Sequence, residues 1–176
     1  YECFNGLRGI IMGQFGYQNV QGSPFEISAV VTSLPAGPQL GDERVYNRVT
    51  YRLVYNAANS QISTGRYASP VPLDGGLYSV TVTTTSDANH HLGAVVVHHA
   101  TATTGTYFWG AIRGVVPMVP SATISAGIVA MCGLSGIVTS GPSLPTETVG
   151  NQPGILCITS GTGGTTPSGT YRINFY

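Results

Sequence analysis

Turn-forming residues interrupt this chain at short intervals, and no other feature limits its possible folds as strongly. Clusters of Gly, Pro and Asn, among them "NGLRG", "NAANS", "SPVPLDGG" and "GNQPG", recur roughly every 8–15 residues. Between them lie short runs rich in Val, Ile, Thr and Tyr, the residues that favour strands. This pattern predicts an all-β fold, either an antiparallel β-sandwich or a barrel.

Three segments alternate apolar and polar side chains with the period of two that a half-buried strand requires. They are "RVTYRLVY" at 48–55, "GLYSVTVTTT" at 76–85 and "TYRINFY" at 170–176. In the first, the apolar residues at odd positions are expected to face the core. Residues 121–134 could begin a helix at a Ser cap, but their two glycines and β-branched residues favour a strand pair.

Composition divides the chain into three parts. Residues 1–40 combine aromatic residues and glycines without sustained alternation, so we expect an extended N-terminal arm that packs on another surface. An edge strand and loop of the same domain is the alternative. Residues 41–112 and 113–176, separated at the proline-bounded "VVPMVPS", are either two small β-modules or one domain over 41–176.

The arm supplies the expected partner contacts, which are four aromatic side chains and one cation. Their alternative role is ordinary packing within their own domain. These five residues are Phe4, Phe15, Tyr17, Phe25 and Arg8.

Charge is scarce and balanced in this chain, which limits the classes of partner. Only 8% of the residues are charged, seven acids balance seven cations, and every cation is arginine. We therefore expect neither nucleic-acid nor membrane binding, since both would use a basic patch. Zero net charge gives little protection against self-association, and arginine suits interfaces better than lysine does. The chain is therefore expected to work inside an assembly, as a homo-oligomer.

All four histidines occur as two adjacent pairs, His90-His91 and His98-His99. The first pair lies at a predicted hairpin turn and the second at the far end of the returning strand, about 20 Å away at 3.3 Å per residue. One metal ion cannot bridge that distance, and neighbours on a strand face opposite sides. We therefore expect no metal site, and interpret the histidines as polar turn and strand-end residues.

No segment carries the pattern of a catalytic site. Ser135 in "GLSGI" lacks the G-x-S-x-G form of a hydrolase nucleophile, and the glycine-rich residues 160–169 lack the lysine of a phosphate-binding loop. Asp42 and Glu43 are neighbours and would diverge on a strand instead of forming an acid/base pair. We therefore expect no catalytic residue, no cofactor and no enzymatic activity.

Aromatic and sulfur side chains are expected in the core. Trp109 and Tyr107 in "TYFWGAI" could stack on a sugar, but aromatic residues on a strand, with Phe108 on the opposite face, are typical of a β-core. Cys132 and Cys157 lie in apolar runs and are expected as buried thiols. A disulfide between these two cysteines is the alternative.

Four segments within residues 40–176 carry a family resemblance. They are "GDERVYNRVTYRLVYNAANSQISTGRYASP", "TYFWGAIRGVV", "ATISAGIVAMCGLSGIV" and "ETVGNQPGILCITSGTGGTTPSGTYRINFY". With these segments the chain resembles bacteriophage capsid decoration (cement) proteins. Its matching elements are turn-and-strand patterns. They are Tyr55-Asn56 followed by Gly65, Trp109 followed by Gly114, and Val149-Gly150 followed by Ile155 and the terminal "YRINFY".

The resemblance implies a β-rich virion protein, made in the host bacterial cytoplasm, that sits on the outer capsid surface. Its partners would be the major capsid protein, whose neighbouring subunits it ties together, and copies of itself, commonly in a homotrimer. The family implies no active site. Two other functions stay open: a fibre or host-recognition domain that binds carbohydrate, and a self-assembling tube or shell subunit.

Overall fold

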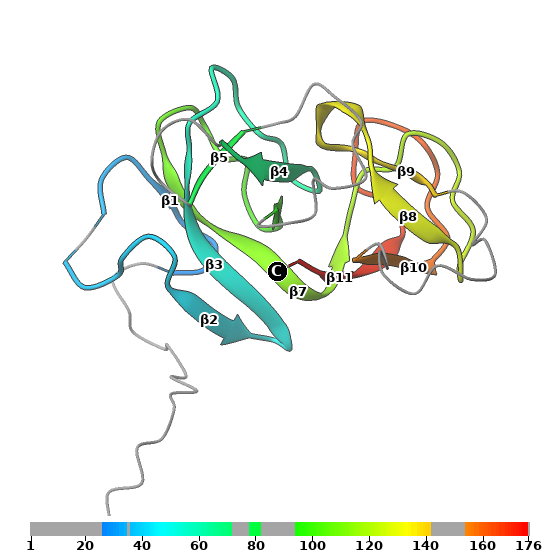
Figure 1. Ribbon diagram of the computed structural model, residues 1–176, viewed down its shortest axis with the longest axis horizontal. Helices are drawn as coiled ribbons and strands as arrows, with labels where there is room; N and C mark the ends of the chain where they lie inside the picture. Colours follow the sequence, from blue (N-terminus) through cyan, green and yellow to red (C-terminus); the bar gives the residue numbers. More distant parts are fainter. Residues whose placement is uncertain (1–25, 35, 72–77, 82–93, 142–153, 176) are drawn as a thin grey trace, which may run out of the picture.

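The computed structural model describes residues 26–34, 36–71, 78–81, 94–141 and 154–175 (Figure 1). Among these residues, no helix is long and apolar enough to span a membrane. The described elements are eleven strands and one 3₁₀ turn. In chain order they are β1 (Val30–Val31), β2 (Glu43–Tyr46), β3 (Val49–Asn56), β4 (Tyr67–Pro70), β5 (Ser79–Thr81), β6 (Val95–Val97), β7 (Tyr107–Pro117), β8 (Val129–Cys132), η1 (Leu134–Gly136), β9 (Val138–Ser140), β10 (Ile155–Thr159) and β11 (Thr170–Asn174).

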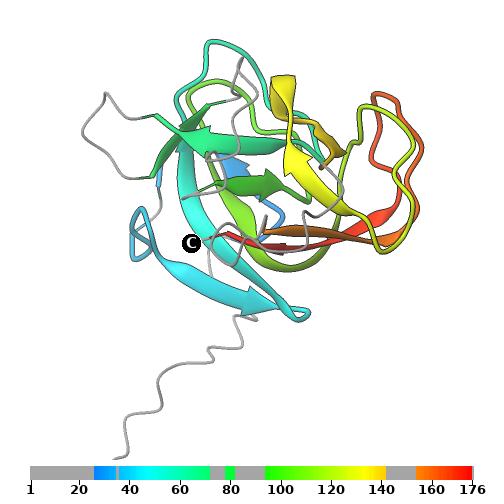
Figure 2. The ribbon, with the colours of Figure 1, turned by 45° about the vertical axis from the view of Figure 1, so that its right-hand side comes forward.

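Five strands close into a first ring. β3 pairs with β5, β5 with β4, β4 with β6 and β6 with β7, and β7 returns to β3. β2 continues the sheet beyond β3, and Figure 2 shows it as the lowest strand of the molecule. A closed ring leaves fewer free strand edges than an open sheet of the same strands, which limits unwanted pairing.

A second ring shares β7 with the first. β11 pairs with the second half of β7, β10 with β11, β8 with β10, and β9 with β8. The path closes through one bridge between Val138 of β9 and Pro120, which lies just beyond β7. In Figure 1, β8, β9 and β10 lie on the right and β3, β4 and β5 on the left, with β7 running between them.

Large apolar side chains fill both rings. Trp109 and Tyr51 in the first ring and Tyr171 in the second are at most 2% exposed. Burying one such side chain stabilises the fold by about 1.5–3 kcal/mol relative to leaving it in water. The predicted alternation holds from Val49 to residue 53, after which Val54 is also buried, so both faces of β3 are covered there.

β7 can serve both rings because its two edges are used by different strands. One edge pairs with β3, and the other pairs in turn with β1, β6 and β11. Arg113 lies where the rings meet, since it is opposite both Thr50 of β3 and Asn174 of β11. The register against β3 shifts at this point, from Thr50–Arg113 to Tyr51–Ala111. Such a β-bulge bends the strand and increases its twist.

Gly114 follows the bulge and lets β7 lie close to the β2–β3 turn. Its φ of +127° is a conformation that L side chains rarely adopt. A Cβ at this position would lie 2.9 Å from the carbonyl oxygen of Arg48 and 3.0 Å from the Cα of Val49. The bend of β7 therefore depends on the absence of a side chain here.

The predicted all-β fold is confirmed, and its closed pairings are those of barrels. The predicted strand 48–55 matches β3 to within one residue at each end, the segment 170–176 contains β11, and residues 121–134 contain β8 instead of a helix. One difference is that β3 and β5 are parallel. The reason is that β5 folds back from β4 to lie between β4 and β3, so it runs in the same direction as β3.

Two predictions on organisation concern regions that the structure describes in part. Residues 1–25 of the expected arm lie outside the described residues, whereas β1 belongs to the same 1–40 segment and pairs with β7. The division into two modules stays a prediction, and its boundary at residues 112 and 113 falls within β7.

We expect Gly114→Ala to lower the free energy of unfolding by about 2 kcal/mol, because a side chain at this positive φ is strained and crowds the turn backbone. Urea denaturation followed by fluorescence measures the change. Gly164→Ala is the matched control, since its Cβ would meet nothing within 4 Å and we expect a change of less than about 0.5 kcal/mol. Equal effects of the two substitutions would contradict this account of β7.

Candidate functional site

Three segments far apart in the sequence line one groove on the exposed side of the sheet. They are residues 47–49 at the β2–β3 turn, 113–115 in β7 and 172–174 in β11. We call these nine residues the arginine groove, which has a volume of about 750 Å³. Each segment contributes one arginine, and these are Arg48, Arg113 and Arg172.

Strand register brings two of these arginines to the same face. Across the β7–β11 pair, Arg113 lies opposite Asn174 and Val115 lies opposite Arg172. Directly opposite residues share a face of the sheet, with Cβ atoms about 4.5–5.5 Å apart. Arg113 and Arg172 are both exposed, whereas Ile173, which follows Arg172 in β11, faces the core and is only 1% exposed.

The third arginine lies in a strained turn. Asn47 and Arg48 form the two-residue connection of the β2–β3 hairpin, with φ values of 49° and 64°. Tight hairpin turns require this left-handed conformation, which glycine adopts freely and asparagine tolerates. For arginine it costs about 1–2 kcal/mol. The sequence therefore carries an arginine where the backbone alone would favour glycine.

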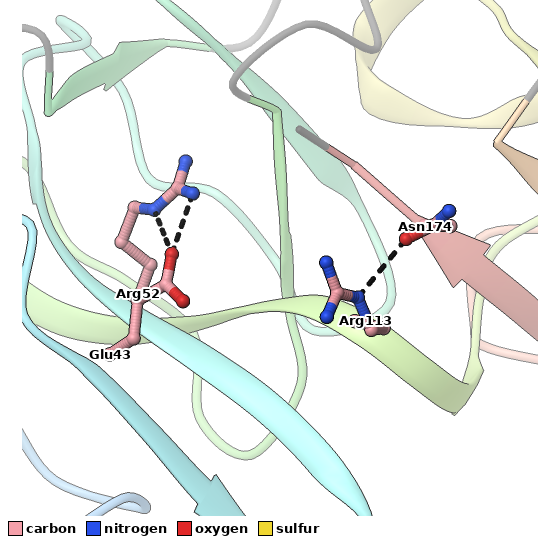
Figure 3. Close-up of polar contacts among 4 residues, drawn as sticks. All are labelled: Glu43, Arg52, Arg113 and Asn174. Atoms are coloured by element: carbon pink, nitrogen blue, oxygen red, sulfur yellow. Dashed lines mark hydrogen bonds and ion pairs between the residues drawn. The ribbon is translucent and has the colours of Figure 1, made fainter. Parts of the chain in front are cut away.

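A hydrogen bond orients Arg113 within the groove. Its Nε donates to Oδ1 of Asn174 over 3.1 Å, as Figure 3 shows. The bond fixes one side of the planar guanidinium and leaves the Nη hydrogens for a further acceptor. Guanidinium groups bind carboxylates and other oxyanions through paired hydrogen bonds, so this arrangement suits an anionic ligand.

No described carboxylate neutralises the arginine groove. The ion pair that the described residues contain joins Arg52 Nη2 to Glu43 Oε1 over 2.7 Å, outside the groove lining (Figure 3). Half of the six described arginines therefore gather in one groove, in a chain with zero net charge. Three like charges side by side create a local positive potential that attracts anions.

Apolar side chains lie beside these cations. Val45 and Val115 are 46% and 45% exposed. Val45 shares the face of Arg113, because it lies opposite Thr50, which in turn lies opposite Arg113. We call Val45, Val115 and the arginine groove together the groove face. Exposed aliphatic groups next to arginine are typical of protein interfaces, where lysine is depleted.

A second polar cluster lies at the end of β6. The Tyr51 hydroxyl is 2.6 Å from Nδ1 of His98 and 2.9 Å from Nε2 of His99. The two imidazole rings have centroids 4.3 Å apart, and Tyr46 contacts His99 edge-on. Since a phenol has a single hydrogen, Tyr51 donates to one ring and accepts from the other.

Burial sets the protonation of this cluster. It raises the pKa of Tyr51 above its ordinary value of 10, so the phenol stays protonated and remains a donor. Burial, aided by the neighbouring His99, lowers the pKa of His98 to about 4, and burial also lowers the pKa of His99. The cluster is therefore a neutral hydrogen-bonded network near neutral pH.

The structure corrects one expectation about the histidines. His98 and His99 were expected to face opposite sides of a strand, but both contact Tyr51. The physical reason is that β6 ends at Val97, so the alternation of a strand does not apply to the bend that follows. Among the described residues, no group of three or more His, Cys, Asp or Glu side chains could hold a metal ion.

Other predicted residues have these outcomes. The arm residues Phe4, Arg8, Phe15, Tyr17 and Phe25 lie outside the described residues, and so do His90 and His91.

Aromatic and sulfur side chains lie where the sequence predicts them. Trp109 and Phe108 are buried in the core as predicted, and Tyr107 is half-buried. Cys132 and Cys157 are buried free thiols as predicted, and no disulfide joins them. Ser135 lies in the η1 turn, and Asp42 accepts a hydrogen bond from the backbone N–H of Gln39.

Sequence reasoning missed the arginine groove. The sequence shows the local position of each arginine but not that the arginines lie together. Arg172 alternates with apolar residues in β11, and Arg48 follows an asparagine at a hairpin turn. Only the pairing of β7 with both β3 and β11 shows that these arginines meet.

We expect the thermal stability of the chain to fall as the pH is lowered from about 6.5 toward 4. The pKa of His98 is about 4 in the folded protein and about 6.5 when unfolded, so the unfolded state binds the proton first and is favoured across this window. Circular dichroism melts between pH 7 and 5 measure the effect.

His98→Gln removes one of the two histidines whose pKa burial lowers, while keeping a polar side chain. We expect the melting temperature of this variant to change less between pH 7 and 5 than that of the unaltered chain. An unchanged pH dependence in the variant would show that His98 is not the titrating group.

Comparison with known proteins gives few matches. No protein-family model matches the chain, and no curated protein sequence matches it. Among solved structures, the fold is similar to the N base of head fiber gp8.5 in bacteriophage phi29, with 11% sequence identity and a TM-score of 0.48. That match covers 70% of this chain and 94% of the other.

Proposed function

We propose that this chain is a non-enzymatic structural protein of a bacteriophage virion. It binds the outer surface of the capsid and stabilises contacts between major capsid subunits, acting as a homo-oligomer that we expect to be a trimer. The observation that carries the proposal is the groove face, which combines exposed aliphatic side chains with three arginines on one side of the sheet.

The composition of the whole chain supports an interface role. It contains no lysine, and 8% of its residues are charged. Freely diffusing proteins usually cover their surface with lysine and acidic residues, whereas interfaces favour arginine and apolar groups. A surface of this kind gains stability when a partner covers Val45 and Val115, which are nearly half exposed in the chain alone.

The double ring suits a protein that stabilises a shell by binding. Two closed rings joined through β7 hold most of the groove face on hydrogen-bonded strands, and a two-residue turn holds Asn47 and Arg48. A pre-ordered surface loses little conformational freedom on binding. A protein that binds only the assembled shell stabilises that state in proportion to its occupancy, through mass action.

Host recognition is a second candidate function, and the arginine groove favours it. Its volume of about 750 Å³ falls in the range of small-ligand sites, which is roughly 300–1,000 Å³. A fibre or receptor-binding domain could use such a groove for an acidic host ligand. The sugar platform considered for Trp109 is absent, because that side chain is buried.

We expect the purified chain to sediment with capsids of the phage that encodes it, and to raise the temperature at which those capsids release DNA. Val45→Asp with Val115→Asp should reduce capsid binding at least about tenfold, since the change places carboxylates at an apolar contact. Leu134→Asp is the control, because Leu134 is 50% exposed on the η1 turn and does not line the arginine groove.

Failure of the unaltered chain to bind these capsids at any concentration would overturn the proposed function. Equal loss of binding in the control would overturn the assignment of the groove face.

We also expect removal of residues 1–25 to lower capsid occupancy, because this segment carries the expected arm contacts. Full occupancy and equal heat resistance with the shortened chain would contradict a role for the arm.

A further inference from the structure

We propose that the arginine groove binds an acidic segment of a partner protein, with aspartate or glutamate carboxylates held by Arg48, Arg113 and Arg172. The identity of the partner as a shell protein rests on the proposed function, whereas the acidic chemistry of its segment rests on the groove alone. Charge complementarity is the first argument. The three guanidiniums have no described carboxylate as an ion-pair partner within the chain.

The strained turn is the second argument. Arg48 has a φ of 64° at a hairpin position where glycine would carry no such strain. Backbone strain at a residue indicates a role for its side chain, because the fold would be more stable with glycine at that position. In the groove lining, that side chain supplies a cation next to β7 and β11.

The orientation of Arg113 is the third argument. Asn174 accepts the Nε hydrogen of Arg113 over 3.1 Å, and the residue pair lies directly opposite across β7 and β11. The guanidinium is therefore positioned before a ligand arrives, which lowers the entropic cost of binding. Its Nη hydrogens can then form the paired hydrogen bonds that a carboxylate accepts.

The lining favours a peptide over other anions. None of the described residues that line the groove is aromatic, so this lining offers no stacking platform of the kind expected for a sugar or a nucleotide base. The chain has zero net charge and no lysine, so it lacks the extended positive field that nucleic-acid binding uses. Val115, whose side chain is 45% exposed, adds an apolar wall beside the arginines, which suits aliphatic side chains between the acidic ones.

Isothermal titration of the full chain tests this inference with a synthetic octapeptide that alternates Asp and Val. A peptide with Asn in place of Asp is the matched probe. We expect the acidic peptide to bind and the Asn peptide to bind at least about tenfold more weakly, because hydrogen bonds to charged groups are worth roughly a factor of ten each. Raising the salt concentration should weaken binding of the acidic peptide.

Variants separate the groove from general charge. Arg113→Gln and Arg172→Gln should each weaken peptide binding about tenfold, whereas Arg52→Gln should change it less than about twofold, since Arg52 pairs with Glu43 outside the groove. Arg48→Gly is the sharpest variant. It should weaken peptide binding while raising the urea midpoint of unfolding, a combination that a purely structural role for Arg48 does not produce.

Three results would overturn the inference: no binding of the acidic peptide, equal weakening by Arg52→Gln, or tighter binding of a single-stranded oligonucleotide or of oligogalacturonate than of the peptide.

The capsid-binding experiment and the peptide titration test separate claims, so either can fail without the other. Capsid binding without peptide binding would reject the acidic segment and keep the proposed function. Peptide binding without capsid binding would reject the shell as partner and keep the acidic segment.

Discussion

The pairing of β7 with strands on both of its edges is the constraint on which the rest of the structure depends. Its backbone carries β3 on one side and β1, β6 and β11 on the other, so it is the strand common to both rings. A strand that enters two rings has to bend, and the bulge at Arg113 with the positive φ of Gly114 supplies that bend. The bend places the second ring beside the first.

The same bend creates the candidate site. Gly114 allows the β2–β3 turn to lie next to β7, and β11 follows β7 on its other edge. Three segments therefore meet at a position where β7 has no side chain to fill the space. The arginines that surround it come from three different strands or turns, and none is neutralised by a described carboxylate. The bend of β7 at Gly114 therefore serves both the two rings and the arginine groove.

The sequence was informative about local structure and much less so about how strands meet. Turn spacing and alternation predicted an all-β chain, the strands β3 and β11, and buried Trp109, Cys132 and Cys157, because these properties depend on neighbours along the chain. The arginine groove depends on pairings between residues more than 50 positions apart, which no local pattern encodes. The contact of both His98 and His99 with Tyr51 was also missed, since it requires knowing where β6 ends.

The groove face is the surface that we propose meets the shell. A cryo-electron microscopy reconstruction of capsids saturated with the chain tests this proposal most directly. We expect Arg48, Arg113 and Arg172 to lie against acidic side chains of the major capsid protein, with Val45 and Val115 covered. A reconstruction in which the groove face points to solvent, while another surface contacts the shell, would contradict it.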